Sequence, residues 1–502
     1  MQNAGARVPW GIKLWYAGGQ AGESIKNFGF TTLLFIYYNQ VLGLSGTWTG
    51  IGVAIALGLD AISDPAVGSW SDGFQSRWGR RHPFMLLSIV PLGLCFLGLF
   101  WPPEGLSQVG LFLWFTGFSV LLRTALTFFH VPYLSLGAEL SQDYQERTQI
   151  VAVRTVIGAL STLTVAAIAW NFIFVSTPGN PAPQLTREPY FMYAILSAVV
   201  MGLLLAASTV FTASAIPQLA GSFQKPRRFT LSAVYRDLFE ALRNVSFRAL
   251  FLGTLIYFVY SGTHGALAMH LKTFYWQLDT VGIQYWQYAN IVGGVVGVPL
   301  APLFNRWFDK KWTVIIGVIG AAIANTGPVA LALLGLMPHD AEVLVPILVA
   351  LAFLSTFFGI QAAVSVASMM GDIADEHELK HGTRQEGIYF GSYSFSQKCT
   401  GALGNMLAGF AIDLIGLDPN TRPGNVSDDV LFGFGACYVA IAVLLIFSIR
   451  IFFPYSLDRR RHVAIVEELG RRRGGVGDPR ASTKRRRGDA LPGLETAPEG
   501  GG

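Results

Sequence analysis

Two aspartates four residues apart interrupt the second long apolar stretch of the sequence. Asp60 and Asp64 stand between Leu59 and Pro65, and a spacing of four places both carboxylates on one face of a helix. Two anions held together in an apolar medium repel each other unless a cation lies between them or one carboxyl group is protonated. Ser63 adds a hydroxyl oxygen, and oxygen ligands suit hard cations. The pattern predicts a cation site; the alternative is that each aspartate is locked to a fixed arginine or lysine.

A second polar face follows in the fourth apolar stretch. Arg123, Thr127 and His130 are four and three residues apart, which is the spacing of neighbours on one helix face. Thr127 can lend a hydroxyl to the same cation. His130 can bind the solute or carry a proton, and a satisfied core histidine is the alternative. Arg123 is either a counter-ion for an acidic group or a side chain that reaches the membrane surface.

Four further charged residues lie inside apolar stretches, where each charge costs at least about 2.5 to 3.5 kcal/mol. Lys398 needs an acidic partner, for which the two aspartates are the candidates. Arg154 can donate to hydroxyl groups of a solute. A purely structural pair is the alternative for both. Glu23 and Lys26, three residues apart, form either a local pair on one helix face or part of a solute site.

Aromatic residues recur at helical spacing in the seventh apolar stretch, at Tyr257, Tyr260 and His264. Aromatic faces can stack on sugar rings, which makes Tyr260 a candidate solute contact. A belt of interfacial aromatic side chains is the alternative.

The composition indicates the solvent that surrounds these charges. Of 502 residues, 52% are hydrophobic and 13% are charged, against about 25% charged in a soluble domain. We therefore expect an all-α membrane protein of twelve transmembrane helices, each with about 20 apolar residues. The apolar stretches fall at 14–42, 46–73, 82–102, 107–138, 149–177, 189–214, 246–276, 281–304, 311–336, 342–371, 385–416 and 426–453.

The chain divides into two similar parts. Residues 1–214 and 246–455 are each expected to form a six-helix half, and 215–245 a cytoplasmic linker, which is a repeat plan of secondary transporters. Lysine and arginine concentrate in alternate loops, so the positive-inside rule places both termini in the cytoplasm, with the protein in a bacterial inner membrane. Residues 456–502 are predicted to be a disordered basic tail, which is either topogenic or in contact with anionic lipid.

Charged residues also cluster in the loops on the predicted cytoplasmic side. A network of salt bridges there would latch one conformation, and simple topogenic charge is the alternative. The candidates for this gating network are Asp72, Arg80, Arg81, Glu139, Arg147, Asp372, Arg384 and Glu386.

Other function classes find little support in the sequence. A phosphate-cradling GxxxxGK[ST] motif is absent, which disfavours ATP-driven transport. His130, His264 and His270 lack the spacing of metal ligands, so we expect neither an enzyme nor a cofactor beyond a coupling Na⁺ or H⁺. The expected partners are a small solute and the lipid bilayer, without nucleic acid or an obligate protein partner; a sensor that binds solute without moving it remains an alternative.

Several separate motifs together resemble the glycoside–pentoside–hexuronide:cation symporters of the major facilitator superfamily, from about residue 16 to about residue 453. They are the run from Asp60 to Pro65 with Gly68, Gly79-Arg80-Arg81, Val131-Pro132-Tyr133 with Gly137 to Leu140, Asp143 with Glu146-Arg147-Thr148 and Arg154, Arg384 to Gly387, and Gln397-Lys398. The resemblance implies the major facilitator fold and symport of a sugar or glycoside with a cation.

The same resemblance implies roles for single residues. It makes Asp60, Asp64 and Thr127 the cation site, places Lys398 near that site and makes Arg154 a sugar contact. Ser63 stands where the melibiose permease of this family has an asparagine, which leaves Na⁺ and H⁺ both open.

The solute side departs from that permease. Ser24 and His130 align with its two galactoside-binding aspartates, Leu134 with its stacking tryptophan, and Glu23 with a lysine. Melibiose itself is therefore not the expected solute. Since the family includes lysolipid carriers, a carrier of another amphiphilic solute on the same scaffold is the alternative to a sugar symporter.

Overall fold

The computed structural model describes residues 7–141, 143–216, 239, 241–382, 386–419 and 421–474, and it is built from helices. In the described part, extended pairing is limited to an isolated bridge between Thr177 and Asn180. The N-terminal half contains α1 (Trp10–Phe28), η1 (Gly29–Leu33), α2 (Leu34–Ile36), η2 (Tyr37–Val41), α3 (Gly46–Gly73), α4 (His82–Phe100), α5 (Gln108–Glu139), α6 (Tyr144–Ile168), η3 (Ala169–Ile173), η4 (Pro183–Leu185), α7 (Glu188–Thr212) and η5 (Ala213–Ala215).

The C-terminal half continues the helical chain. It contains α10 (Val245–His270), η6 (Leu271–Tyr275), α11 (Thr280–Leu333), α12 (Ala341–His381), α13 (Glu386–Ile415), α14 (Asp428–Ile441), α15 (Val443–Phe452) and α16 (Arg459–Gly474). The predicted linker 215–245 falls largely on residues 217–238 and 240, which lie outside the described residues.

Capping side chains explain where many of these helices begin. Ser45, Ser107, Asp143, Asn244 and Asp279 each accept a hydrogen bond from a backbone N–H in the first turn of the following helix, which satisfies a donor that has no partner within the helix. The apolar composition of the long helices then allows them to cross the lipid bilayer.

Nine helices in the described part of the chain are long and apolar enough to cross a membrane. This confirms the expected all-α membrane class, whereas the count of twelve stays a prediction. Part of the difference lies in α11, whose 54 residues contain a break at Asp309, where φ is 64° and ψ is 154°. Two shorter helices therefore meet within α11.

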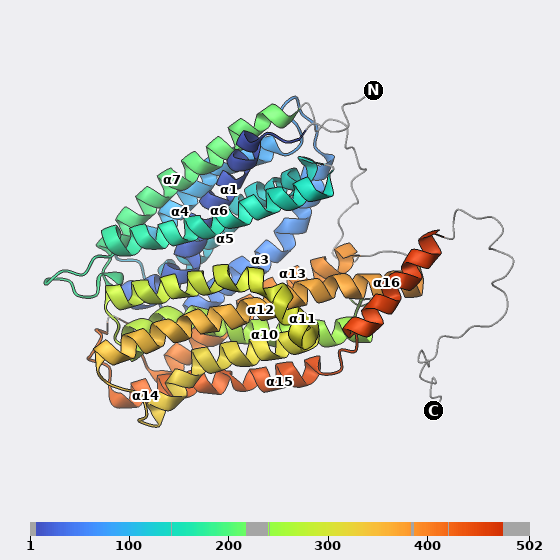
Figure 1. Cartoon of the computed structure of the whole chain (residues 1–502). Coiled ribbons are helices and arrows are strands. Elements are labelled where there is room, and N and C mark those ends of the chain that lie inside the picture. Colours follow the sequence, from blue (N-terminus) through green and yellow to red (C-terminus); the bar gives the residue numbers. More distant parts are fainter. Residues whose placement is uncertain are drawn as a thin grey trace.

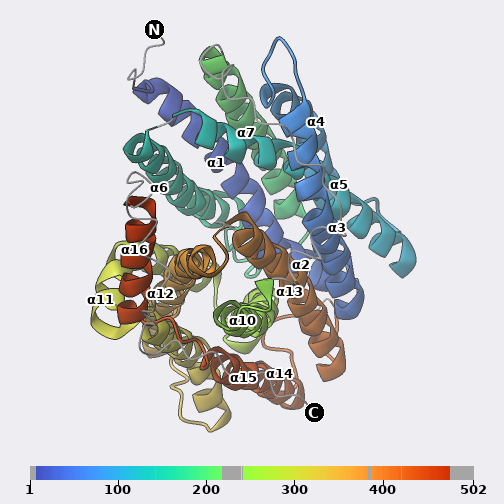
Figure 2. The same cartoon turned by 90° about the vertical axis from the view of Figure 1, so that its right-hand side faces the viewer.

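The helices form two groups that follow the order of the chain (Figures 1 and 2). One group holds α1 and α3 to α7, and the other holds α10 to α15. The two groups diverge toward the end of the molecule where α1 begins and α16 lies (Figure 1), which we call the terminal side. The opposite end is called the far side.

Contacts between the halves gather on the far side. The carboxylate of Asp413 on α13 accepts from the backbone N–H groups of Gly46 and Thr47, at 2.7 and 2.8 Å, at the N-terminus of α3, where unpaired N–H groups favour an anion. Asn171 donates to the Tyr288 hydroxyl at 3.2 Å. Further contacts there join Asn39 to His270 at 3.0 Å and Ser176 to Thr280 at 3.0 Å.

Small residues allow α3 and α13 to pack backbone against backbone at this closure. A Cβ atom at Gly50 would lie 2.4 Å from the carbonyl oxygen of Asn405, and one at Gly409 would lie 2.0 Å from that of Gly46. Such close approach is typical of membrane helices that meet through small residues.

The predicted disorder of the tail is wrong for residues 459–474, which form α16. Ile465 and Leu469 are buried, because they recur at helical spacing and form an apolar stripe. Arg461 and His462 contact Glu376 and Asp375 of α12 at 3.4 and 3.2 Å. Residues 475–502 lie outside the described residues.

A side chain at Gly50 should force α3 away from α13. We expect Gly50→Val to lower the free energy of unfolding by about 1 to 3 kcal/mol, the usual cost of overpacking. Gly58→Val is the matched control on the same helix, because a Cβ atom at Gly58 would meet nothing within 4 Å. Thermal unfolding of both purified variants checks this; equal melting temperatures would contradict the close packing.

Candidate functional site

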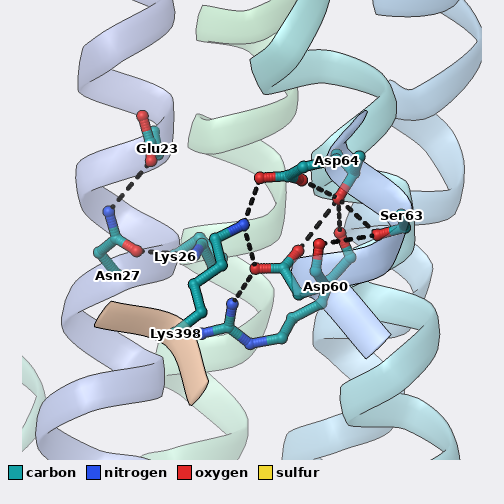
Figure 3. A network of polar contacts seen from close by, with 9 residues as sticks. Glu23, Lys26, Asn27, Asp60, Ser63, Asp64 and Lys398 are labelled. Carbon is teal, nitrogen blue, oxygen red and sulfur yellow. Dashed lines mark hydrogen bonds and ion pairs between the residues drawn. The ribbon is translucent and has the colours of Figure 1, made fainter. Parts of the chain in front are cut away.

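The two aspartates of α3 meet basic side chains from both halves of the molecule. Arg123 Nη1 of α5 lies 2.7 Å from Asp60 Oδ2. Lys398 of α13 reaches between the carboxylates (Figure 3), with its Nζ 3.0 Å from Asp60 Oδ2 and in direct contact with Asp64 Oδ2. The acidic partner expected for Lys398 is therefore present, and the open question about Arg123 is decided in favour of a counter-ion.

Four oxygen atoms converge on the other side of the aspartate pair. Thr127 Oγ1 lies 3.0 Å from Asp60 Oδ1, 2.9 Å from Asp64 Oδ1 and 3.3 Å from Ser63 Oγ. A hydroxyl group has one proton to donate, so Thr127 cannot donate to both carboxylates at once. One of these short oxygen–oxygen contacts needs a shared proton or a cation to be favourable.

The two carboxylates differ in their access to water. The side chain of Asp60 is 7% exposed and is held by both basic residues, whereas Asp64 is 29% exposed and Lys398 is 22% exposed. The alternative interpretation, in which an aspartate is held by a fixed basic residue, thus fits the contact between Asp60 and Arg123. Asp64 instead pairs with a lysine that itself reaches solvent.

A second acidic group lies on α1 beside this cluster. His130 Nδ1 is 3.0 Å from Glu23 Oε2. Asn27 donates to Glu23 Oε1 at 3.4 Å and accepts from Lys26 Nζ at 2.6 Å, so it bridges the two residues (Figure 3). The expected direct pair of Glu23 and Lys26 is therefore replaced by hydrogen bonds through Asn27. The Glu23 carboxylate pairs instead with His130 of the neighbouring helix α5.

The remaining predicted solute contacts have partners other than the aspartates. Arg154 Nη1 donates to the Tyr16 hydroxyl at 3.5 Å. Ser24 donates to the carbonyl of Gly158 at 3.1 Å, a contact that ties α1 to α6. Tyr260 lines a cavity in the C-terminal half.

The predicted gating residues form one cluster in each half. Arg81 contacts Asp72 at 2.5 Å and Glu139 at 2.8 Å, and Arg80 contacts Glu139 at 3.1 Å. Arg147 donates to the carbonyl of Ser141 at 2.6 Å.

In the C-terminal half, Lys310 and His462 contact Asp372 at 2.6 and 3.3 Å. Arg384 lies outside the described residues, and the side chain of Glu386 is not described.

A buried charge within a predicted transmembrane stretch was missed in the sequence. Lys272 is 4% exposed and lies in the π-helical segment η6. The available signal was a lysine within the seventh apolar stretch, 246–276. Within the described ranges, no group of three or more His, Cys, Asp or Glu residues could hold a metal ion, so any cation bound at the aspartates would rely on hydroxyl oxygens as well.

Comparisons with known proteins agree with the membrane fold and extend it. The sequence matches the profile of the family described as MFS/sugar transport protein over residues 15–459. It is 26% identical over 480 residues to the glucuronide carrier protein homolog of Escherichia coli (strain K12), covering 91% of this chain and 95% of that protein.

Two further proteins, one compared by sequence and one by structure, are also similar to this chain. The sequence is 24% identical over 485 residues to the sodium-dependent lysophosphatidylcholine symporter 1-A of Danio rerio, covering 89% and 86% of the two chains. A crystal structure of a point mutant of the nucleoside transporter NupG superposes with a TM-score of 0.60 at 11% identity, covering 88% of this chain and 99% of that one. The latter likeness concerns the fold, and it confirms the predicted major facilitator architecture.

Removing Lys398 alone should leave the aspartates with too little positive charge. We expect Lys398→Met to lower the melting temperature. The double variant Lys398→Met/Asp64→Asn should regain most of that loss. The effects of the two substitutions on the free energy of unfolding should therefore deviate from additivity by about 0.5 to 3 kcal/mol, as is usual for residues in contact. Thermal unfolding of the two single variants and the double variant measures the coupling. Lys380→Met, which removes a more exposed pair with Glu376, is the control with a small expected effect; strictly additive losses at positions 64 and 398 would refute the pairing.

Proposed function

This chain belongs to the family of MFS/sugar transport proteins and is a secondary transporter rather than an enzyme; we propose that it carries a sugar or glycoside together with Na⁺ or H⁺ bound at Asp60 and Asp64. The observation that supports this most directly is the hydroxyl of Thr127, which lies within 3.0 Å of both carboxylates. A cation or a proton among these oxygens removes the repulsion between the two anions.

Lys398 supplies the positive charge when the coupling cation is absent. A Na⁺ ion or a proton that reaches the partly exposed Asp64 replaces part of that charge and releases the ammonium group from the pair. The solute site and the cation site then favour each other's occupancy, a reciprocal coupling that is typically about 1 to 3 kcal/mol.

The solute is proposed to bind between the halves, next to the aspartates. Glu23 and His130 offer a paired acceptor and donor on α1 and α5. Arg154 offers a guanidinium with only a weak contact to Tyr16, at 3.5 Å, so it can donate to solute hydroxyls. Alternating access would follow from rocking of the two helix groups around this site.

We also propose that the terminal side faces the cytoplasm of a bacterium. The start of α1, the basic loop between α3 and α4, and α16 lie on that side (Figure 1), in accordance with the positive-inside rule. Since the halves are joined on the far side, the structure would then correspond to a state open toward the cytoplasm, and the Arg81 cluster would contact its counterpart in the opposite state.

A carrier of an amphiphilic lipid such as a lysolipid is the second candidate. An apolar groove of about 590 Å³ lies between α1, α6 and α7, with Ile25, Val165 and Leu204 among its lining residues. A relative of similar identity is a lysophosphatidylcholine symporter by name. Uptake of a labelled lysolipid that competes with every glycoside tested would favour this alternative.

Neutralising the exposed aspartate should uncouple transport from the cation gradient. We expect Asp64→Asn to reduce gradient-driven accumulation at least about tenfold while solute exchange remains, because the variant keeps the cavity but lacks one anion. Membrane vesicles given a panel of labelled glycosides, with sodium and proton gradients imposed separately, measure both quantities. Asp429→Asn, at an exposed position of α14, is the matched control. Normal accumulation in Asp64→Asn would disprove the cation assignment.

The histidine beside Glu23 should act on the solute. We expect His130→Ala to weaken solute affinity roughly tenfold, the effect of losing one hydrogen bond to a charged group, with a much smaller change in the cation concentration for half-maximal uptake. Initial uptake rates over a matrix of solute and cation concentrations separate the two constants. An isolated change in cation dependence would overturn this role.

A further inference from the structure

The guanidinium group of Arg123 is held at the aspartates by a single hydrogen bond. It donates to Asp60 Oδ2 through Nη1 alone, at 2.7 Å, and its Nε is buried without a hydrogen-bond partner among the described residues. Arginine and carboxylate groups frequently pair through two parallel hydrogen bonds, which also fix the plane of the guanidinium. A single bond leaves that plane free to turn, so another contact must set the orientation of Arg123.

The ring of Phe30 provides that contact. The central guanidinium carbon of Arg123 lies 4.6 Å from the centroid of the Phe30 ring, within the distance at which the face of an aromatic ring attracts a cation. Phe30 is 8% exposed and the side chain of Arg123 is 14% exposed, and this attraction is stronger where water is excluded. Lys26 Nζ lies 5.9 Å from the same centroid, so two cations lie near one ring.

Phe30 differs in its neighbours from the other buried phenylalanines of this part of the chain. Phe28 packs against the ring of Tyr193 and Phe35 against that of His270, with centroids 6.2 and 5.7 Å apart, as is common among buried aromatic side chains. Within the described ranges Phe30 pairs with no other aromatic ring, and its ring lies against cations instead. A role in apolar packing alone does not explain this arrangement.

The backbone around Phe30 departs from a regular α-helix. Phe30 lies in η1, where the helix widens into a π-helical turn, and such turns are frequent at functional sites. Gly29 begins this turn, and a Cβ atom there would lie 2.9 Å from the ring of Phe96 on α4. Close packing against α4 therefore fixes the turn that carries the Phe30 ring toward α5.

We propose that Phe30 is a positioning residue of the cation site, because its ring keeps the guanidinium of Arg123 on Asp60 Oδ2. Asp60 Oδ1 and Asp64 Oδ1, which both lie within 3.0 Å of Thr127 Oγ1, are thereby left to the coupling cation. A guanidinium released from the ring could turn its remaining N–H donors toward both carboxylates and displace the cation. The inference rests on the proposed transport function and concerns the same site.

The cation affinity of the purified full-length protein tests this role without a solute. Thermal unfolding is followed while NaCl replaces choline chloride at constant ionic strength, and separately while the pH is varied without Na⁺, since a bound cation stabilises the folded state. The part of either effect that Asp64→Asn abolishes belongs to the aspartates. We expect Phe30→Leu to weaken the affinity for the stabilising ion about five- to thirtyfold, the size of a cation–π contact shielded from water, and Phe30→Tyr, which keeps the ring, to retain it.

Phe35→Leu is the matched control, because it makes the same change at a buried ring of the neighbouring segment α2. It should lower the melting temperature but leave the ion affinity unchanged. An equal loss of ion affinity in Phe35→Leu and Phe30→Leu would show a general effect of packing and overturn the proposal. An unchanged or higher ion affinity in Phe30→Leu, or a loss in Phe30→Tyr as large as that in Phe30→Leu, would overturn it as well.

A double-mutant cycle establishes whether Phe30 acts through Arg123. In an Arg123→Gln background, Phe30→Leu should change the ion affinity by less than about twofold, because the guanidinium that the ring positions is gone. A loss as large as that in the unmodified background would contradict the proposal.

Failure of the proposed function gives a different result from failure of this inference. If neither Na⁺ nor H⁺ stabilises the unmodified protein through Asp64, the cation site is wrong and the positioning role of Phe30 is wrong with it. If one of these ions stabilises the protein through Asp64 and Phe30→Leu leaves its affinity intact, the cation site stands and the positioning role alone is refuted.

Discussion

Negative charge kept inside a lipid-solvated helix bundle is the constraint on which the rest of this structure depends. Asp60 and Asp64 cannot both remain ionised in an apolar medium unless positive charge is brought to them. That requirement explains why Arg123 extends from the neighbouring helix of the same half and why Lys398 extends from the opposite half. The ion cluster therefore joins the two halves of the molecule.

The two basic partners of the aspartates belong to different halves of the molecule, so a movement of the halves would affect their contacts differently. Arg123 and Asp60 belong to the same half, so their contact can persist while the halves move. Lys398 belongs to the other half, so its contact with Asp64 changes whenever α13 moves against α3. In the proposed mechanism, this side chain links the occupancy of the oxygen cluster to the relative position of the halves.

The sequence was sufficient to predict the features that depend on helical period and on the cost of charge in lipid. Asp60 and Asp64 share one face as their spacing indicated, Thr127 meets them as the family resemblance implied, and Lys398 meets the partners expected for it. The partner of Glu23 could not be predicted, because its own helix offers Lys26 at a suitable spacing and only the packing of α1 on α5 brings His130 closer. Lys272 was missed although it gives the same signal as Lys398, a lysine within an apolar stretch.

The tail shows where composition misleads. Arginine and glycine dominate the residues after 456, and such composition is typical of disorder. Ile465 and Leu469 nevertheless provide an apolar stripe, and the acidic end of α12 provides partners that are far away in sequence. Local composition cannot reveal a binding surface that another helix supplies.

The position of α16 also bears on how the chain is made. The backbone N–H of Arg459 at its start donates to Asp309 within α11 at 3.2 Å, and its basic face covers Glu376 and Asp375. Because domains acquire their contacts during synthesis from the N-terminal end onward, these acidic groups lack their contacts with α16 until residues 459–474 have left the ribosome. Completion of the C-terminal half is thus a late event in biogenesis, and a chain shortened at residue 456 would leave the acidic surface of α12 permanently uncovered.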